Sequence, residues 1–531
     1  MNKITSSRNR ALIVVVIATA IVYIPVLYGL KDAFFYNGVP SLENIAYVLS
    51  KDSIQYSLRF TFIQALLSSL IAVVIGSITA FTLLLIGSRR AALLRALSIV
   101  PFMSPPMVVV TGFTALYGVH GIVSSIIPQA KILGYGFWAI IAAHVFYNIP
   151  LAINFVYSSL VSIPRSLLDT VRMYGFGNAS FMVRKVVIPY ILPAIASAFT
   201  LTFIYCFTSF AIPLTLGGVK YSTLEVYIYY YYKIVFEPEK AAAIAFIQYI
   251  ILLAIVSIFI YFHGKTFAAP IGYRHYRFQL RSGYRILLLI ILGTVYAYLY
   301  APLLAIAYYA FYDPYTGSLT LSGFSKILAF TYDPGLGVNI GVVYVNTLYY
   351  ALMTGLLSIV LSTIIVYYGG RVVDTLYASL LAVSPLTLSL GLMRAYSLYI
   401  PNAFLIILAH TIASLPLTTR VLRIGFERIN RRFIEAAYML GEHGLPLHFR
   451  VIYPLMKPSY LVALSLALVV SLGEFGATLF ISTPETITLG IAVYRYRGLR
   501  EWTASAASAS ILLLLTGAIL VILSRRMERW L

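Results

Sequence analysis

The sequence contains one cysteine and few charged residues, and both shortages narrow what the chain can be. With Cys206 alone, no disulfide can form within the chain. Charged residues make up 10% of the 531 residues, against 61% that are hydrophobic. That is too little polar surface to cover a water-soluble protein of this size. We therefore expect the chain to lie in a lipid bilayer.

Two sequence patterns are also missing. No GxxxxGKS/T phosphate-binding loop occurs, so we do not expect the chain to hydrolyse ATP, to act as an enzyme or to hold a cofactor. The hydrophobic runs are continuous rather than alternating, which excludes a membrane-spanning β-barrel. What remains is an all-α polytopic membrane protein.

Hydrophobic runs long enough to cross about 30 Å of hydrocarbon as helices recur along the whole chain. We count about twelve transmembrane helices. The first six are expected near 11–30, 57–87, 93–117, 135–163, 190–216 and 241–262, and the second six near 284–311, 345–369, 374–396, 400–422, 459–482 and 503–524. The first run lacks a small-residue cleavage site before Lys31, so we expect a retained helix rather than a signal peptide.

The net charge of +21 could suggest a nucleic-acid partner, but its placement argues against one. If the N-terminus is cytoplasmic, 26 of the 38 lysines and arginines fall on the inner side of the predicted helices. This asymmetry follows the positive-inside rule of membrane insertion. We therefore predict a multi-pass protein of the plasma membrane, in contact with lipid, with both termini in the cytoplasm and no nucleic-acid partner.

The two halves of the sequence repeat each other. Pairs 266 residues apart include His144 with His410, Asp169 with Glu435 and Gly175 with Gly441. Beyond them the separation becomes 265, as between Pro189 and Pro454. Nearer the start of each half the match is looser, and Ser57 resembles Thr347 at a separation of 290. Six helices lie between equivalent points, so the two repeats are expected to be parallel, related by an axis along the membrane normal.

The repeat divides the chain into three parts. Residues 1–262 are the predicted first repeat, residues 263–285 a short basic cytoplasmic linker, and residues 286–531 the second repeat. Each repeat carries a cytoplasmic loop after its fourth predicted helix, at 164–189 and at 423–454. No separate soluble domain is expected.

These two loops share one spacing. The second reads Glu435-Ala436-Ala437, with Gly441 six residues after the glutamate and Pro454 thirteen residues after the glycine. The first reads Asp169-Thr170-Val171, followed by Gly175 and Pro189. We expect the acidic residue to begin a short helix, the glycine to end it, and the proline to mark the start of the next membrane helix.

This spacing resembles the EAA loop of binding-protein-dependent ABC permeases, and the resemblance extends over nearly the whole chain. It is strongest for the fused two-domain ferric-iron and thiamine type. The resemblance implies a type I-like importer fold and a coupling helix in each loop that docks one of two separate ABC ATP-binding subunits. It also implies an extracytoplasmic solute-binding protein as a partner. The first loop departs from the pattern, with Asp-Thr-Val in place of Glu-Ala-Ala. Weaker docking of an ATP-binding subunit by this loop therefore stays open.

Several polar residues fall inside the predicted helices. Glu474 lies in the eleventh, with Ser209 as its repeat equivalent. It is a candidate for the substrate pathway, and a buried packing contact is the equal alternative. His144 and His410 lack neighbouring ligands in the sequence, so we expect packing contacts and no metal site. The 44 tyrosines are spread along the chain, which favours interfacial anchoring over a cation-binding cage.

Taken with the resemblance, these features predict the permease subunit of an ABC importer. Its substrate would be a small solute, with thiamine and ferric iron both open. The alternative is a twelve-helix secondary transporter with two parallel repeats. That class predicts intramembrane acidic relays, for which Glu474 is the obvious candidate, and it leaves the paired loops without a role. A channel would explain the repeat but not the loop spacing.

Overall fold

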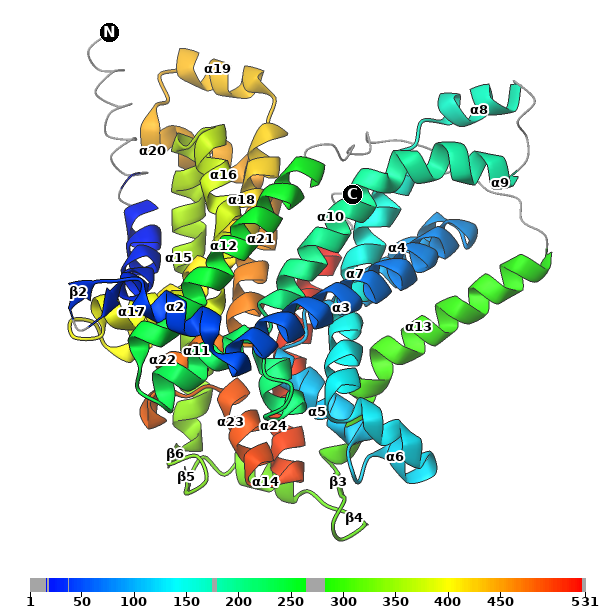
Figure 1. The fold of residues 1–531 in the computed structure, drawn as a ribbon. Helices are drawn as coiled ribbons and strands as arrows, with labels where there is room; N and C mark the ends of the chain where they lie inside the picture. Colours follow the sequence, from blue (N-terminus) through cyan, green and yellow to red (C-terminus); the bar gives the residue numbers. More distant parts are fainter. Residues whose placement is uncertain (1–15, 17–18, 37, 174–178, 264–281, 528–531) are drawn as a thin grey trace. The chain divides into compact units, whose positions relative to one another are not determined.

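The structure is a computed structural model that describes residues 16, 19–36, 38–173, 179–263 and 282–527. Within these residues, ten helices are long and apolar enough to cross a membrane, or eleven if one sharply bent pair is counted as a single span. The protein is therefore an all-α polytopic membrane protein, as the sequence predicts (Figure 1). The first predicted span, 11–30, is described only at residue 16 and from residue 19 onward, where helix 19–31 is found.

The helical elements of the first half run as follows. They are η1 (Asp32–Phe34), α2 (Glu43–Ser50), α3 (Asp52–Leu85), α4 (Ser88–Phe102), α5 (Pro106–Tyr117), α6 (Ile122–Ile126), η2 (Pro128–Leu133), α7 (Phe137–Val161), α8 (Arg165–Met173), α9 (Ala179–Met182), the π-helical turn η3 (Val183–Val187), α10 (Ile188–Phe207), a second π-helical turn η4 (Pro213–Gly217), α11 (Leu224–Lys233) and α12 (Pro238–His263).

The second half repeats much of this order. It contains α13 (Ser282–Tyr309), α14 (Ser322–Ile327), α15 (Ile340–Tyr368), α16 (Arg371–Ser379), η5 (Leu380–Ala382), α17 (Pro385–Tyr396), α18 (Asn402–Glu427), α19 (Arg431–Met439), α20 (Gly444–Leu447), the π-helical turn η6 (His448–Ile452), α21 (Tyr453–Gly473), α22 (Gly476–Ile481), η7 (Pro484–Thr486), α23 (Leu489–Gly498) and α24 (Trp502–Met527). Three antiparallel strand pairs complete the fold: β1 (Phe35–Tyr36) with β2 (Val39–Pro40), β3 (Tyr312–Asp313) with β4 (Ser318–Leu319), and β5 (Tyr332–Asp333) with β6 (Val338–Asn339).

The third predicted helix of each half is broken, which corrects the expected continuous spans at 93–117 and 374–396. In the first half, α4 ends before Ser104, because Pro105 and Pro106 follow and disfavour a helical conformation in the residue before them. In the second half, the chain turns by 103° between Leu376–Ala382 and Pro385–Tyr396. The Ser384 side chain caps the new helix by accepting the amide hydrogen of Thr387.

The predicted helices at 190–216 and 459–482 are also shorter than expected. The long helices end at Phe207 in α10 and at Gly473 in α21. Short elements, η4 and α22, follow after a break in each half. Both breaks contain a polar residue, Ser209 or Glu474, within a run that is apolar on average, so mean hydropathy alone does not reveal them.

The internal repeat is visible in the helix boundaries. The π-helical turns η3 and η6 begin 265 residues apart, and α8 and α19 begin 266 apart. For α3 and α15, however, the separation of 290 is wrong. The hydroxyl of Thr61 accepts the amide hydrogen of Leu224, and that of Thr347 accepts the amide hydrogen of Leu489. This shared contact pairs Thr61 with Thr347, a separation of 286.

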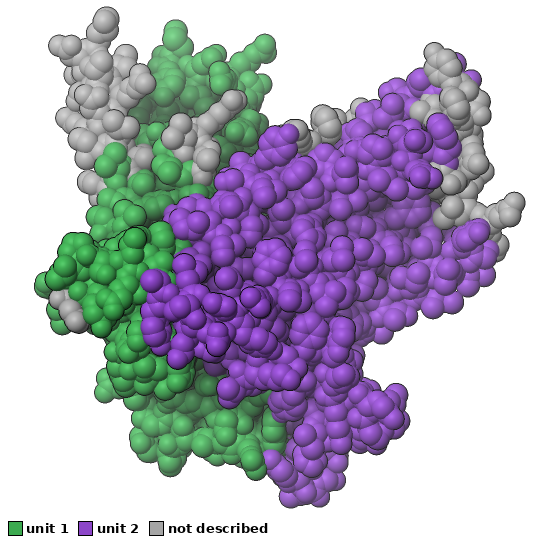
Figure 2. Space-filling view, in the orientation of Figure 1, with its two compact units in different colours: residues 1–45, 228–246, 321–531 green, residues 46–227, 247–320 purple. Residues whose placement is uncertain are grey.

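The chain forms two compact units that do not coincide with the two sequence repeats (Figure 2). Unit 1 contains residues 1–45, 228–246 and 321–531, and unit 2 contains residues 46–227 and 247–320. Each unit thus takes a helix from the opposite half of the sequence: helix 19–31 belongs to unit 1, and α13 belongs to unit 2.

Within each unit, the helix taken from the opposite half packs closely against a glycine. In unit 1, a Cβ on Gly391 of α17 would collide with the carbonyl oxygen of Pro25. In unit 2, a Cβ on Gly112 of α5 would collide with the carbonyl oxygen of Pro302 in α13. Both glycines lie seven residues into their helices. Absence of a side chain there allows two helix backbones to touch, as is common in membrane helix packing.

Candidate functional site

The second predicted loop forms a short helix, α19, beyond the ends of α18 and α21 (Figure 1). The helix begins at Arg431, where the side-chain oxygen of Asn430 accepts the amide hydrogen of Arg432 at 3.1 Å. The expectation that Glu435 begins the helix is wrong, since Glu435 is its fifth residue. Asparagine is a preferred N-cap, so Asn430 was the signal in the sequence that predicts the true start.

Gly441 ends α19 with a φ of +82°, a conformation that glycine reaches without a steric penalty. The amide of Glu442 donates to the carbonyl of Ala437, and the amide of Gly441 donates to the carbonyl of Tyr438, both at 3.0 Å. This pair of bonds is a Schellman motif, which satisfies the last carbonyls of the helix. An ion pair between Arg450 and Glu442, at 2.7 Å, then joins the turn to the next helix.

Residues of the Glu-Ala-Ala sequence face in different directions. Ala437 is the residue of α19 that is buried, and it packs with Leu422 of α18 and Ile452 of η6. Glu435 and Ala436 are exposed. The small Ala437 side chain and the half-buried Ile434 therefore hold the helix on its core, while the opposite surface faces outward. That outward surface includes three large apolar side chains, Phe433, Met439 and Leu440, of which Met439 is 88% exposed.

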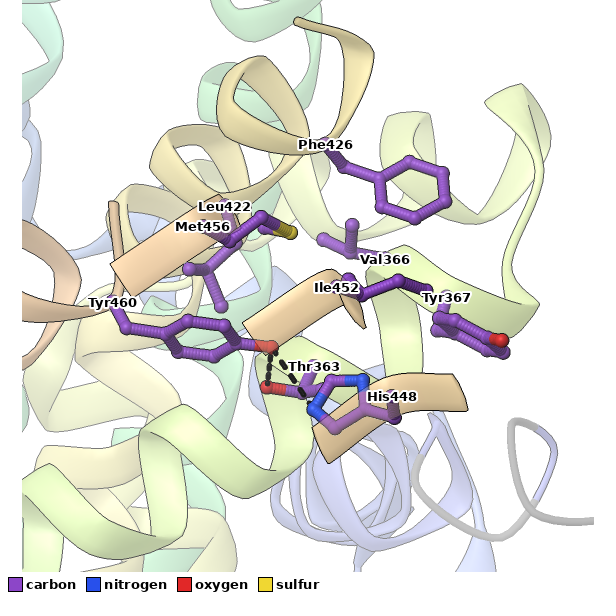
Figure 3. Close-up of a pocket in the computed structure, with 9 residues that line it drawn as sticks. All are labelled: Thr363, Val366, Tyr367, Leu422, Phe426, His448, Ile452, Met456 and Tyr460. Atoms are coloured by element: carbon purple, nitrogen blue, oxygen red, sulfur yellow. Dashed lines mark hydrogen bonds between the residues drawn. The ribbon is translucent and has the colours of Figure 1, made fainter. Parts of the chain in front are cut away.

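A small pocket lies in the same core, with about 190 Å³ of empty space including its opening. Its lining residues come from α15, α18, η6 and α21 (Figure 3). Tyr460 marks the polar end, where its hydroxyl lies 3.2 Å from Thr363 Oγ1 and 3.4 Å from His448 Nε2. The opposite end is apolar and includes Phe426 and Val366.

Each loop proline is the second residue of the next long helix, Pro189 in α10 and Pro454 in α21, close to the predicted start, but helical turns precede both. Pro454 lies ten residues after the start of α20, and η6 and α21 continue α20 without a break. Pro189 likewise follows α9 and η3. Proline lacks an amide hydrogen, and its ring crowds the carbonyl four residues earlier. The wider π-helical turn before each proline accommodates this clash, so the helix continues through it.

The first predicted loop forms α8, and Asp169 is its fifth residue, as Glu435 is in α19. Asp169 is exposed. Gly175 lies outside the described residues. The two loop helices therefore begin at equivalent positions, each four residues before its acidic residue.

Glu474 and Ser209 lie in the breaks that follow α21 and α10. The carboxylate of Glu474 accepts the amide hydrogen of Ala477 at 2.9 Å, and the side chain is partly exposed. Ser209 is also partly exposed, and its carbonyl oxygen accepts the hydroxyl hydrogen of Thr223 at 3.4 Å. The two residues belong to different units, so each is described within its own.

The two repeat histidines have different surroundings. In unit 1, His410 spans the break after α21: its Nδ1 lies 2.8 Å from Ser471 Oγ and its Nε2 lies 2.8 Å from Thr478 Oγ1. In unit 2, His144 is equally buried. No group of three or more metal-binding side chains is found among the described residues.

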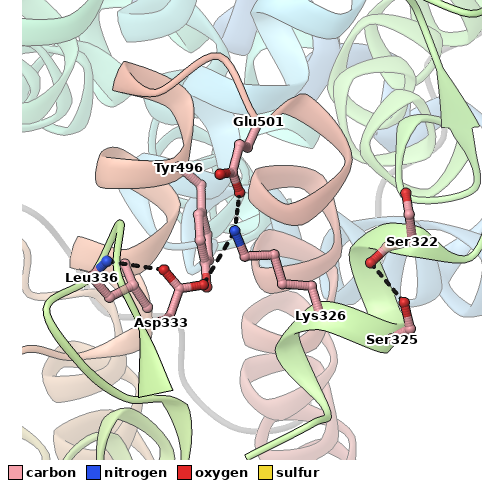
Figure 4. Close-up of polar contacts among 7 residues, drawn as sticks. All are labelled: Ser322, Ser325, Lys326, Asp333, Leu336, Tyr496 and Glu501. Atoms are coloured by element: carbon pink, nitrogen blue, oxygen red, sulfur yellow. Dashed lines mark hydrogen bonds and ion pairs between the residues drawn. The ribbon is translucent and has the colours of Figure 1, made fainter. Parts of the chain in front are cut away.

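A polar cluster that the sequence did not reveal joins α14, α23 and the loop around β5 (Figure 4). Lys326 Nζ lies 2.5 Å from Glu501 and 3.2 Å from Asp333, whose other contacts are the Tyr496 hydroxyl and the Leu336 amide. Burial opposes ionisation of Asp333, but the hydrogen bonds from Tyr496, Leu336 and Lys326 outweigh it and hold the pKa of this carboxyl below its ordinary value.

Comparisons with known proteins agree with these features. Residues 72–265 match the family described as "Binding-protein-dependent transport system inner membrane component". The chain is 27% identical to the thiamine transport system permease protein ThiP of Haemophilus influenzae, over 88% of this chain and 87% of that protein. It is 26% identical to ThiP of Escherichia coli, over 86% of both chains. It is 23% identical to the ferric transport system permease protein FbpB of Actinobacillus pleuropneumoniae, over 82% of this chain and 66% of that one.

Proposed function

Because the chain is a membrane transport component, similar over most of its length to fused permeases of ABC importers, we propose that it forms the translocation pathway of a thiamine importer. Its relatives are transport permeases rather than enzymes. The proposal includes an extracytoplasmic binding protein that delivers the solute. It also includes two copies of an ABC ATP-binding subunit, which supply the energy.

The loop helix α19 is the observation that carries the proposal. A helix that transmits movement must be held firmly on one side and offer a contact on the other. Ala437 and the Schellman turn at Gly441 hold α19 on its own bundle. The exposed Phe433, Met439 and Leu440 offer an apolar contact surface, and such side chains are typical anchors of protein interfaces. We propose that α19 and α8 each dock one ATP-binding subunit.

Thiamine is preferred to ferric iron on two grounds. The thiamine permeases align with this chain over most of their own length, whereas the ferric permease extends well beyond the aligned part. In addition, the described residues contain no cluster of three metal-binding side chains that would favour an iron pathway. Ferric iron remains the second candidate.

We propose Glu474 as a pathway residue for a cationic solute. Glu474 is a partly exposed residue at the break between α21 and α22. Its carboxylate accepts backbone hydrogen bonds from Ala477 and Gly476 and keeps further lone pairs for a passing cation. Ser209 holds the equivalent position in the first repeat. Glu474→Gln keeps a backbone hydrogen bond but removes the charge, so uptake of thiamine is expected to fall while ATP hydrolysis continues. Unchanged uptake would remove Glu474 from the pathway.

For orientation, we propose that α8 and α19 face the cytoplasm and that both termini lie on the same side, in the plasma membrane. A twelve-helix secondary transporter is the competing function. It would move solute without an ATP-binding subunit and would respond to an ion gradient instead.

Uptake by proteoliposomes separates the two. The chain is reconstituted with its ATP-binding subunit, and thiamine-loaded binding protein is added on the outside. The importer proposal predicts thiamine uptake that requires internal ATP and is unaffected by protonophores. Uptake driven by a proton or sodium gradient without the ATP-binding subunit would overturn it.

A further inference from the structure

The helix bundle of unit 2, here the first bundle, contains a group of buried polar atoms without hydrogen-bond partners among the described residues; the bundle of unit 1 is the second bundle. They are Gln64 Oε1 and Ser68 Oγ on α3, both ring nitrogens of His144 and Asn148 Oδ1 on α7, and Thr202 Oγ1 on α10. All five side chains are at least 97% buried. Polar groups buried in a protein interior almost always have a partner, and inside a membrane bundle bulk water does not supply one.

Two of these side chains, Gln64 and Asn148, contact Cys206 of α10. The side-chain amide of Gln64 donates to the Cys206 carbonyl at 2.8 Å, and that of Asn148 lies 3.5 Å from the Cys206 sulfur. Ser68 follows Gln64 by four residues, and Thr202 precedes Cys206 by four, so each lies one helical turn further along the same helix face. The helices α3, α7 and α10 all pack against one another.

Flipping the side-chain amide of Gln64 or Asn148 does not supply the missing hydrogen bonds. The Gln64 amide nitrogen donates to the carbonyls of Thr61 and Cys206, and the Asn148 amide nitrogen donates to the carbonyl of His144. Reversing either amide would place oxygen against oxygen. Both carbonyl oxygens are therefore left as acceptors.

The second bundle holds the equivalent histidine with its own side chains, although the hydroxyls of Tyr350 and Thr354, the equivalents of Gln64 and Ser68, are also buried without partners among the described residues. His410, the repeat equivalent of His144, contacts Ser471 and Thr478. The residues that correspond to these two in the first bundle are Cys206 and Pro213. A thiol is a weak hydrogen-bonding group and proline offers none in its side chain. The first bundle has therefore lost both partners of its histidine.

We propose that the first bundle has an internal water-binding site between α3, α7 and α10, centred on His144. A buried water makes about three hydrogen bonds, so about two waters satisfy the six atoms. The acceptors are Gln64, Asn148 and one nitrogen of His144, and the hydroxyls of Ser68 and Thr202 act as donors or acceptors. Water can both donate and accept hydrogen bonds, so it suits all of these atoms.

A cation fits this site less well than water. α7 and α10 carry no charged residue, and those of α3, Asp52 and Arg59, precede Gln64. No carboxylate on these helices lies at this level to balance a cation inside the membrane. The two bundles should also respond differently when their helices shift. Water bound at His144 can exchange hydrogen-bond partners, whereas Ser471 and Thr478 hold His410 directly.

Radiolytic hydroxyl-radical footprinting of the full chain in lipid nanodiscs tests this site, because radicals formed from bound water oxidise the side chains next to it. Both histidines are buried to nearly the same extent, so a dry interior predicts equal, low oxidation. The water site predicts severalfold more oxidation at His144 than at His410. Replacing Na⁺ and K⁺ with choline should leave this ratio unchanged.

Two nearly isosteric variants should both lower the ratio of His144 to His410 oxidation, each by acting on a different histidine. Ser471→Cys removes a partner of His410 and should raise its oxidation, whereas Cys206→Ser returns a hydroxyl next to His144 and should lower its oxidation. Ser389→Cys is the matched control, since this buried serine donates to the carbonyl of Pro385 within its own helix. Equal oxidation of the two histidines in the wild type, a variant that leaves the ratio unmoved, or loss of the signal in choline would overturn the proposal.

Discussion

The amide of Glu442 donates to the carbonyl of Ala437 across Gly441, at 3.0 Å. Ala437 also helps to hold α19 on its core. One short segment therefore fixes both where the loop helix ends and where it rests. Movement of a partner bound to α19 would pass to α18 and α21 through this segment, which is what coupling requires.

Replacing Gly441 should disturb the loop without disturbing the bundle. A Cβ at this position would touch nothing within 4 Å, but the φ of +82° disfavours a side chain by about 1–2 kcal/mol. Gly441→Ala is therefore expected to reduce ATPase coupling while the thermal stability of the bundle hardly changes. Gly498→Ala is the control, because that glycine also has open space around it and lacks the positive φ. Equal coupling in both variants would contradict this role.

The exposed apolar side chains of α19 should bind the ATP-binding subunit. Met439→Asp places a charge on a side chain that is 88% exposed, so folding should be unaffected and co-purification of the subunit should fall. Interface anchors of this kind typically contribute about 2 kcal/mol or more, or roughly thirtyfold in affinity. Leu319→Asp, at a position 79% exposed in β4, is the control and should bind normally. Normal binding by the Met439 variant would rule out this surface.

Close backbone packing at Gly112 and Gly391 should make both positions intolerant of alanine. Each added methyl would meet a proline carbonyl of the packed helix, and such overpacking typically costs about 1–3 kcal/mol. Thermal unfolding in detergent should therefore show lower Tm values for Gly112→Ala and Gly391→Ala. Gly517→Ala, in open space on α24, should be neutral or slightly stabilising. Unchanged Tm values for the first two variants would argue against the observed helix contacts.

The ion cluster at Asp333 should make stability depend on pH. The pKa of Asp333 is lowered in the folded protein, so its contribution is complete above the unfolded pKa and is lost as the pH falls through the folded pKa. Asp333→Asn is expected to cost about 1–3 kcal/mol at pH 7 because a buried charged acceptor is removed. The difference from wild type should shrink at acidic pH.

Asp313→Asn is the control for this measurement. Asp313 accepts the backbone amide of Tyr315 on a surface hairpin, and an asparagine oxygen can do the same. Little change is expected at any pH. A Tm difference for Asp333→Asn that stays constant between neutral and acidic pH would show that the charge of Asp333 is not responsible.

Much of the architecture could be predicted from the sequence because it depends on periodicity and hydropathy. The helices, their repeat and the two loops all follow from local patterns. The breaks at Ser104 and Val383 depend on proline and cap chemistry within apolar runs, which a hydropathy count does not detect. The pairing of α3 with α15 was misjudged because Ser57-Leu58 is a short match, whereas the contacts of Thr61 and Thr347 fix it in three dimensions.

The sequence predicted which residues form the candidate site, but it predicted their structural roles less well. Gly441 has the conformation that its position suggests, but Glu435 does not begin its helix, since Asn430 caps it earlier. The division of the chain into units could not be foreseen, because helix 19–31 and α13 cross to the opposite half through contacts at Gly391 and Gly112. Contacts between residues distant in sequence leave no local pattern.

The central claim, that this chain couples ATP hydrolysis to import, is tested most directly by ATPase activity. The chain is reconstituted with its ATP-binding subunit, and binding protein loaded with thiamine or with ferric iron is added to wild type and to Glu435→Ala/Gly441→Pro. The account predicts stimulation by the thiamine-loaded protein in the wild type and its loss in the double variant. Failure of the subunit to associate, or equal stimulation of both forms, would contradict it.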